Sequence, residues 1–107
     1  MSNPIFNVSN TGGRRAVTSA GQRLALGGGG GDQIRVYNKG PDDVCLLVGD
    51  GTQSAVFPTD AATSNGAGLV MGPGVEVFSI QNASVDVHAI CDTGGTATIY
   101  VSRGNGQ

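Results

Sequence analysis

The single histidine of this 107-residue chain, His88, is the side chain best suited to proton transfer near neutral pH. It lies in an alternating apolar segment, and Asp86 stands two residues before it, so both side chains face the same side of an extended strand. There a carboxylate could orient the imidazole. Hydrolysis would also require a nucleophile on a sharp turn, and the sequence has no Gly-x-Ser-x-Gly motif. We therefore interpret His88 as a surface or interface residue and expect no enzymatic activity.

The two cysteines, Cys45 and Cys91, both fall in segments that are predicted to be strands. Together with His88 they provide three of the four ligands of a tetrahedral zinc site, so we expect no metal. A disulfide would require their Cα atoms to lie within roughly 7 Å, which a sequence does not establish. Because the chain does not open on a basic and then apolar segment of the secretory type, we expect it to fold in a reducing cytoplasm. We interpret the cysteines as two buried free thiols.

Two further patterns resemble ligand sites without having their full chemistry. The glycine run at 27–31 is not followed by the Lys-Ser/Thr pair of a phosphate loop, and it leads into a strand pattern. We interpret it as a flexible loop between strands. The eight carboxylates are scattered over turns, and none forms the Asp-x-Asp-x-Asp-Gly spacing of a calcium loop. The sequence therefore predicts no cofactor.

Composition narrows the classes of partner. The net charge is -2 and the pI is about 4.9, whereas binding to nucleic acid normally requires a basic surface. No apolar stretch approaches the ~20 residues of a membrane-spanning helix. We therefore expect neither nucleic acid nor a membrane as partner. The 19 glycines disfavour long helices, because a glycine in a helix interior costs about 1 kcal/mol.

The elements that must position all these residues are short apolar runs, most of them bounded by Gly, Pro, Asn or Asp. Runs of this length at roughly ten-residue spacing are typical of all-β proteins. We predict an all-β fold: a single antiparallel β-sandwich, jelly-roll-like, with about eight short strands. The runs are Ile5–Val8, Gln22–Leu26, Gln33–Asn38, Val44–Val48, Leu69–Met71, Val75–Ile80, Val85–Cys91 and Thr96–Ser102.

One face of each strand must fill the space between the two sheets. The predicted core consists of Phe6, Leu24, Leu26, Ile34, Val36, Val44, Leu46, Val48, Val77, Val87, Ala89, Ile99 and Val101. Several strands carry apolar residues on their second face as well, which would need cover from loops or from another subunit. On this basis we predict a subunit-facing surface made of Phe78, Ile80, Ile90 and Tyr100. A shift of one residue in register would exchange the two faces.

Three segments resemble small structural proteins of tailed bacteriophages. They are the opening Ser2–Phe6, the central Gln33–Gly40 with its Val-Tyr-Asn-x-Gly turn, and the ending Gly95–Gly104; the Pro-Gly-x-Glu-x-Phe segment at 73–78 is also similar. The resemblance covers most of the chain and concerns strands and turns. It implies a virion β-sandwich, and the size and the missing catalytic set fit a capsid decoration (cement) protein. Such a protein would be assembled in the cytoplasm of the bacterial host and located in the virion.

The interpretation as a decoration protein implies different roles for residues 1–20 and 21–107. We expect 1–20 to be an extended arm, with Phe6, Arg14 and Arg15 facing the capsid, and 21–107 to be the sandwich domain. The alternative is that the arm is an ordinary edge strand. The expected partners are the major capsid protein and further copies of the chain, as a homotrimer or homodimer. A head–tail or tail accessory protein and a soluble lectin-like module are the two alternatives for function.

Overall fold

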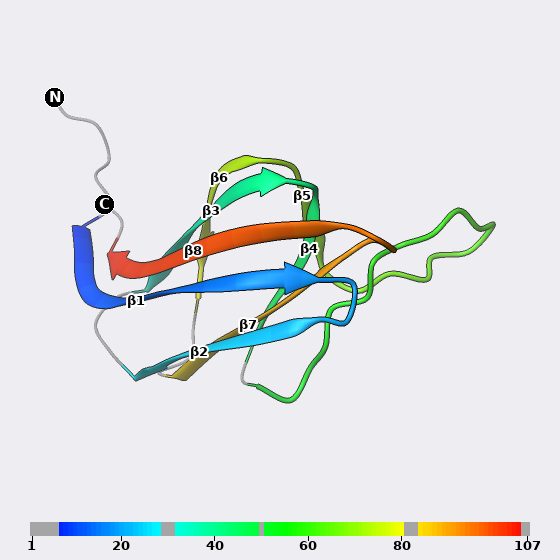
Figure 1. Cartoon of the computed structure of the whole chain (residues 1–107). Helices are drawn as coiled ribbons and strands as arrows, with labels where there is room; N and C mark the ends of the chain where they lie inside the picture. The colour runs from blue at the N-terminus through cyan, green and yellow to red at the C-terminus, as the bar shows by residue number, and fades with distance from the viewer. Residues whose placement is uncertain (1–6, 29–31, 50, 81–83, 106–107) are drawn as a thin grey trace, which may run out of the picture.

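Eight strands make up the regular structure in a computed structural model of the chain (Figure 1), which describes residues 7–28, 32–49, 51–80 and 84–105. Within these ranges no helix is long and apolar enough to cross a membrane. The strands are β1 (Asn7–Thr18), β2 (Gln22–Gly28), β3 (Gln33–Pro41), β4 (Val44–Gly49), β5 (Leu69–Met71), β6 (Gly74–Ser79), β7 (Ser84–Cys91) and β8 (Thr96–Asn105).

The strands pair in a nested order. β1 pairs with β8, β2 with β7, β3 with β6 and β4 with β5, all antiparallel, as if one long hairpin had been closed on itself. Two further pairings, β3 with β8 and β4 with β7, roll this hairpin into a first sheet, β1-β8-β3-β6, and a second sheet, β2-β7-β4-β5. This order is that of a jelly roll. The predicted all-β sandwich is therefore confirmed.

The core lies between the two sheets, and β3 shows why the sequence builds it. Along this strand Ile34, Val36 and Asn38 are buried, while Arg35 and Tyr37 between them are exposed, as the period of two predicts. The predicted core is confirmed for eleven residues: nine are buried, and Leu24 and Val48 are partly buried and pack against the buried cluster. The buried ones are Leu26, Ile34, Val36, Val44, Leu46, Val87, Ala89, Ile99 and Val101.

The prediction is wrong for β6. Val77, expected in the core, leaves 46% of its surface exposed, whereas Phe78 and Ile80 pack against the buried cluster of this chain. The cause is the pairing with β3, which sets Phe78 opposite the inward-facing Ile34 and Val77 opposite the outward-facing Arg35. Phe78 and Ile80 are therefore core-packing residues, and the proposal that they face another subunit is withdrawn.

The N-terminal segment also differs from its prediction. Residues 7–18 form β1, the edge strand of the first sheet, which pairs with β8 up to Val17 and Thr18. Val17 is buried in the core. Over its described part the expected arm is therefore the edge strand that was the alternative, and it belongs to the sandwich. Phe6 lies outside the described residues.

A buried amide holds the β3–β4 turn in place. The Asn38 Nδ2 donates to the carbonyl oxygens of Asp42 (3.0 Å) and Met71 (3.4 Å), and its Oδ1 accepts from the Gly40 N–H (2.8 Å). Gly40 has a φ of 89°, which favours glycine. Because these hydrogen bonds replace those to water, they offset the cost of burying the Asn38 amide in the core. It fixes the end of the sandwich at which the β3–β4 and β7–β8 turns meet.

Candidate functional site

The outer surface of the first sheet is not covered by any other described part of the chain. Its four strands place Arg14, Tyr100, Tyr37 and Val75 in a row from β1 to β6, since each is the Cα partner of the next. The neighbouring row brings Arg35 of β3 opposite Val77 of β6. We call this surface the open face and define it by Arg14, Arg35, Tyr37, Val75, Val77 and Tyr100.

The centre of the open face is apolar and aromatic. The rings of Tyr37 and Tyr100 stack with their centroids 6.0 Å apart and an interplanar angle of 22°. Tyr37 is 39% exposed, Val75 45% and Val77 46%. A contiguous exposed patch of this kind marks an interaction site in soluble proteins, and tyrosine is enriched at protein interfaces because its ring is apolar and its hydroxyl polar.

The charges on the open face are all positive. Arg14 and Arg35 are exposed, and neither makes an ion pair with a described residue. In the described strands of this sheet, no Asp or Glu side chain lies on the open face. Glu76 stands between Val75 and Val77 in the sequence, so its side chain is on the opposite side of β6. Uncompensated guanidinium groups around an aromatic centre favour an acidic protein surface as the partner.

The outer surface of the second sheet is built differently. Residues 51–68, which we call the strap, return along β7 and β4 and then project beyond the β7–β8 turn as the green loop of Figure 1. The strap buries Ala55 and Cys45, which are 3% and 0% exposed. The Arg23 guanidinium donates to the Gln53 carbonyl (2.6 Å), and an antiparallel bridge joins Val56 to Ala67. This surface is largely occupied by the chain itself.

His88 belongs to this covered surface. Its Nδ1 accepts a hydrogen bond from the Ala55 N–H (2.8 Å), so it fastens the strap. Asp86 lies on the same face of β7, as predicted, but its carboxylate is 3.8 Å from the Arg23 guanidinium, and the structure gives it no hydrogen bond to the imidazole. Burial, and then the charge of Arg23, lower the pKa of His88 and favour the neutral ring that this hydrogen bond requires. The geometry assigns His88 a structural role.

Both cysteines are free and buried, as predicted. The Cys45 Sγ lies 3.5 Å from the Val56 carbonyl oxygen and 3.4 Å from that of Ala67, beneath the strap. The Cys91 Sγ lies 3.6 Å from the Val17 carbonyl oxygen, inside the core. Burial raises the pKa of both thiols, and nearby Asp42 and Asp43 raise that of Cys91 further, so both are held in the unreactive thiol form.

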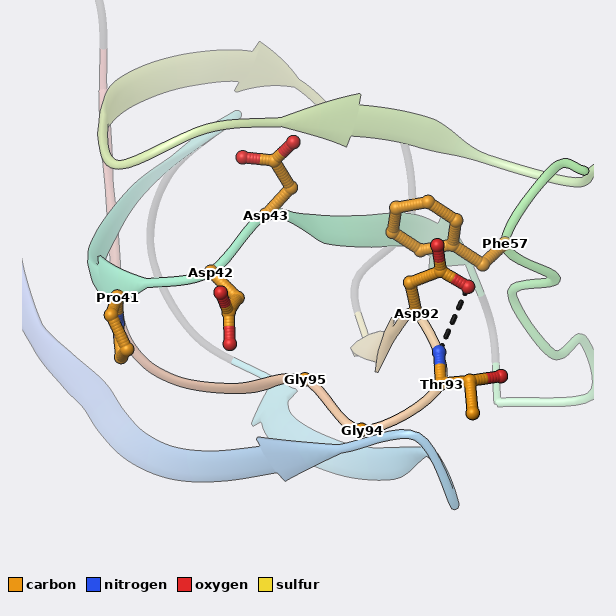
Figure 2. A pocket seen from close by; sticks show the side chains of 8 residues that line it. All are labelled: Pro41, Asp42, Asp43, Phe57, Asp92, Thr93, Gly94 and Gly95. Atoms are coloured by element: carbon orange, nitrogen blue, oxygen red, sulfur yellow. Dashed lines mark hydrogen bonds between the residues drawn. The ribbon is translucent and has the colours of Figure 1, made fainter.

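A cleft of about 380 Å³ opens at the end of the sandwich, between the β3–β4 turn, the β7–β8 turn and the strap (Figure 2). Its carboxylates are those of Asp42, Asp43 and Asp92. Two of them complete turns: Asp42 accepts from the Thr96 N–H (2.9 Å) and Asp92 from the Thr93 N–H (2.8 Å). Among the described residues no three His, Cys, Asp or Glu side chains gather as a metal site would require.

The structure brings together only part of the predicted site. Tyr100 of the predicted subunit surface and Arg14 of the predicted arm are Cα partners on the open face. Arg15 is exposed on the edge strand beside them, whereas Ile90 is half-buried on the second sheet. Sequence reasoning missed Arg35, Tyr37, Val75 and Val77. The signal for Arg35 and Tyr37 was present, because they alternate with the predicted core residues of β3.

No protein-family model, curated protein or solved structure matches this chain. The open face is therefore the feature from which its function must be argued.

Proposed function

We propose that the chain is a non-enzymatic structural protein of a bacteriophage virion, a capsid decoration protein that binds the major capsid protein. The observation that carries the proposal is the open face, where Tyr37, Val75 and Val77 expose apolar surface on the outer side of the first sheet. An exposed surface of this apolar and aromatic composition suits a protein partner. The resemblance of the strand-and-turn segments to phage structural proteins supports a location in the virion.

The fold is compatible with this role but does not carry it. Jelly rolls occur in viral capsid proteins and also in lectins and cupins, so the architecture leaves several functions open. What favours a virion role over catalysis is the way the reactive groups are used. His88 fastens the strap, and both thiols are buried and protonated. These groups stabilise the sandwich in place of facing a substrate.

A lectin-like module is the second candidate, and the stacked pair of Tyr37 and Tyr100 is the observation in its favour. Sugars bind on aromatic platforms, and this pair forms one. The described side chains around it are valines and arginines, however, and they form no ring of amides and carboxylates that would hydrogen-bond several sugar hydroxyls. The protein-binding role therefore fits the surface better.

The test is co-sedimentation of the purified chain with virus particles that lack it, followed by localisation in a map of the intact particle. Val77→Lys places a charge on the open face and should weaken attachment by roughly tenfold or more, since interface centres are depleted in lysine. The matched control is Val56→Lys, because Val56 is also 46% exposed but lies on the strap. Equal attachment by both variants, or absence of the chain from particles, would refute the proposal.

The same map distinguishes the head from the tail. Density for the chain on the capsid shell supports a decoration protein, whereas density at the neck or along the tail would assign it to the head–tail or tail accessory class. A chain that binds immobilised oligosaccharide through Tyr37 and is missing from particles would be the lectin-like module.

A further inference from the structure

Two surfaces of the molecule carry described charges of opposite sign. The open face carries Arg14 and Arg35, with Lys39 exposed further along β3. The end of the sandwich that holds the β3–β4 and β7–β8 turns carries Asp42, Asp43 and Asp92, all exposed. We call the second surface the acidic end and define it by these three carboxylates together with Phe57. Each chain therefore carries a basic surface and an acidic surface whose charges are complementary.

The acidic end offers a carboxylate that the fold does not use. Asp42 and Asp92 accept backbone N–H groups of the β7–β8 turn region, but Asp43 makes neither a hydrogen bond nor an ion pair with a described residue. Figure 2 shows the carboxylates of Asp42 and Asp43 directed to opposite sides of the β3–β4 turn. Asp43 is therefore available to a guanidinium group of a neighbour, and carboxylate–arginine pairs have strong, directional hydrogen bonds.

We infer that the open face of one copy binds the acidic end of a second copy, and that Arg35 and Asp43 are central to this contact. Charge complementarity decides the occupant: two open faces packed on each other would oppose their arginines, whereas the open face and the acidic end attract. The apolar side chains Val75 and Val77 would then be covered beside the charged pair. The inference rests on the proposed structural role and names the partner of the open face within it: that partner is the next copy, and attachment to the capsid shell then depends on the assembled copies.

Because the two surfaces differ, the contact is heterologous. Such contacts generate closed rings when the rotation between copies closes, and open filaments when it does not. A heterologous contact that closes as a ring of three copies would give the homotrimer, one of the two oligomers expected for a decoration protein. Sedimentation velocity of the purified wild-type chain should therefore show an oligomer, and raising the salt from ~0.05 to ~0.5 M should shift it toward monomer, since salt screens exposed charges.

Charge reversal tests the pair directly. Arg35→Asp and Asp43→Arg should each raise the dissociation constant by about tenfold or more, because each sets like charges against each other. The double variant Arg35→Asp/Asp43→Arg restores opposite charges and should recover most of the wild-type assembly. Asp60→Arg is the matched control: it reverses an exposed carboxylate of the strap and should leave assembly unchanged. Far-UV circular dichroism checks the fold of each variant.

If a reversal variant fails to fold, Arg35→Gln and Asp43→Asn replace it, and each should still weaken assembly severalfold. A wild-type chain that stays monomeric at low salt, or a double variant no better than the singles, overturns the inference. These results are separable from the proposed function. A monomer that still attaches to particles refutes the contact between copies alone, whereas an oligomer that never attaches supports the contact and refutes the decoration role.

Discussion

The outer surfaces of the two sheets differ in whether another part of the chain covers their apolar side chains. Both sheets carry apolar side chains on the side away from the core. On the second sheet the strap covers the central ones, so Cys45 is fully buried beneath it, although Val70 of the edge strand β5 stays 39% exposed. On the first sheet no described segment does this, and Tyr37, Val75 and Val77 keep 39–46% of their surface exposed. Where the chain covers a sheet, that sheet stabilises the fold; where it does not, the sheet is available to a partner.

The difference extends to the polar groups. On the covered side Arg23 bonds the Gln53 carbonyl and lies near Asp86, and His88 accepts from Ala55. On the open face Arg14 and Arg35 have no charged partner among the described residues. Polar side chains that are satisfied within the chain contribute to its stability, whereas unpaired exposed ones contribute little to folding and are available for recognition.

The strongest test of this difference between the two surfaces is to introduce a carboxylate on each of them. Cys45→Asp would bury a carboxylate against the carbonyl oxygens of Val56 and Ala67, and we expect a loss of about 4 kcal/mol of folding free energy or no folded protein. Val77→Asp should cost only about 1 kcal/mol, because 46% of the Val77 surface is already exposed and the carboxylate can stay hydrated. Urea unfolding of the two variants measures both; similar losses would contradict the comparison.

The fit of the strap on the second sheet is tested by one glycine. Gly68 has a φ of 117°, and a Cβ there would clash with the Leu46 carbonyl oxygen. We expect Gly68→Ala to cost about 3 kcal/mol, from both the backbone strain and the displaced strap. Gly94→Ala is the control, because Gly94 has a φ of 78° but open space around it, and should cost about 1 kcal/mol. Thermal unfolding distinguishes them, and equal shifts would show that the strap is not tightly fitted.

The smallest effect concerns pH. The pKa of His88 is lowered in the folded chain from its ordinary 6.5, so the unfolded chain binds more protons in this range. The stability due to neutral His88 is therefore complete above pH 6.5 and is lost as the pH falls through the lower folded pKa. The expected loss is about 1 kcal/mol, the net value of one hydrogen bond.

The His88→Gln variant provides the control for this pH effect. It should unfold in urea with a flatter dependence on pH between about 7 and 5, since the titrating group is gone. If stability falls equally in the wild-type chain and in the variant, other groups cause the pH dependence. His88 would then not stabilise the strap through its neutral form.

The fold class could be read from the sequence because its signals are local. Gly, Pro, Asn and Asp bound most of the strands, and in β3 one face is apolar and the other polar, which fixes Ile34 and Val36 inside. The open face was only partly predictable. Tyr100 and Arg14 were singled out for separate surfaces, and nothing local indicated that the β1–β8 pairing would make them neighbours.

The sequence by itself determined the approximate positions of the strands from Gln22 onward and the all-β fold class, because turn residues and the period of two act over a few positions; it missed the extent of β1, which is Asn7–Thr18. Tertiary structure alone decided which face of β6 is inside, since Val77 and Phe78 are both apolar and only the pairing with β3 distinguishes them. It also decided that the strap covers the second sheet and not the first. That choice depends on contacts such as Ala55 with His88, which are far apart in the chain and leave no local pattern.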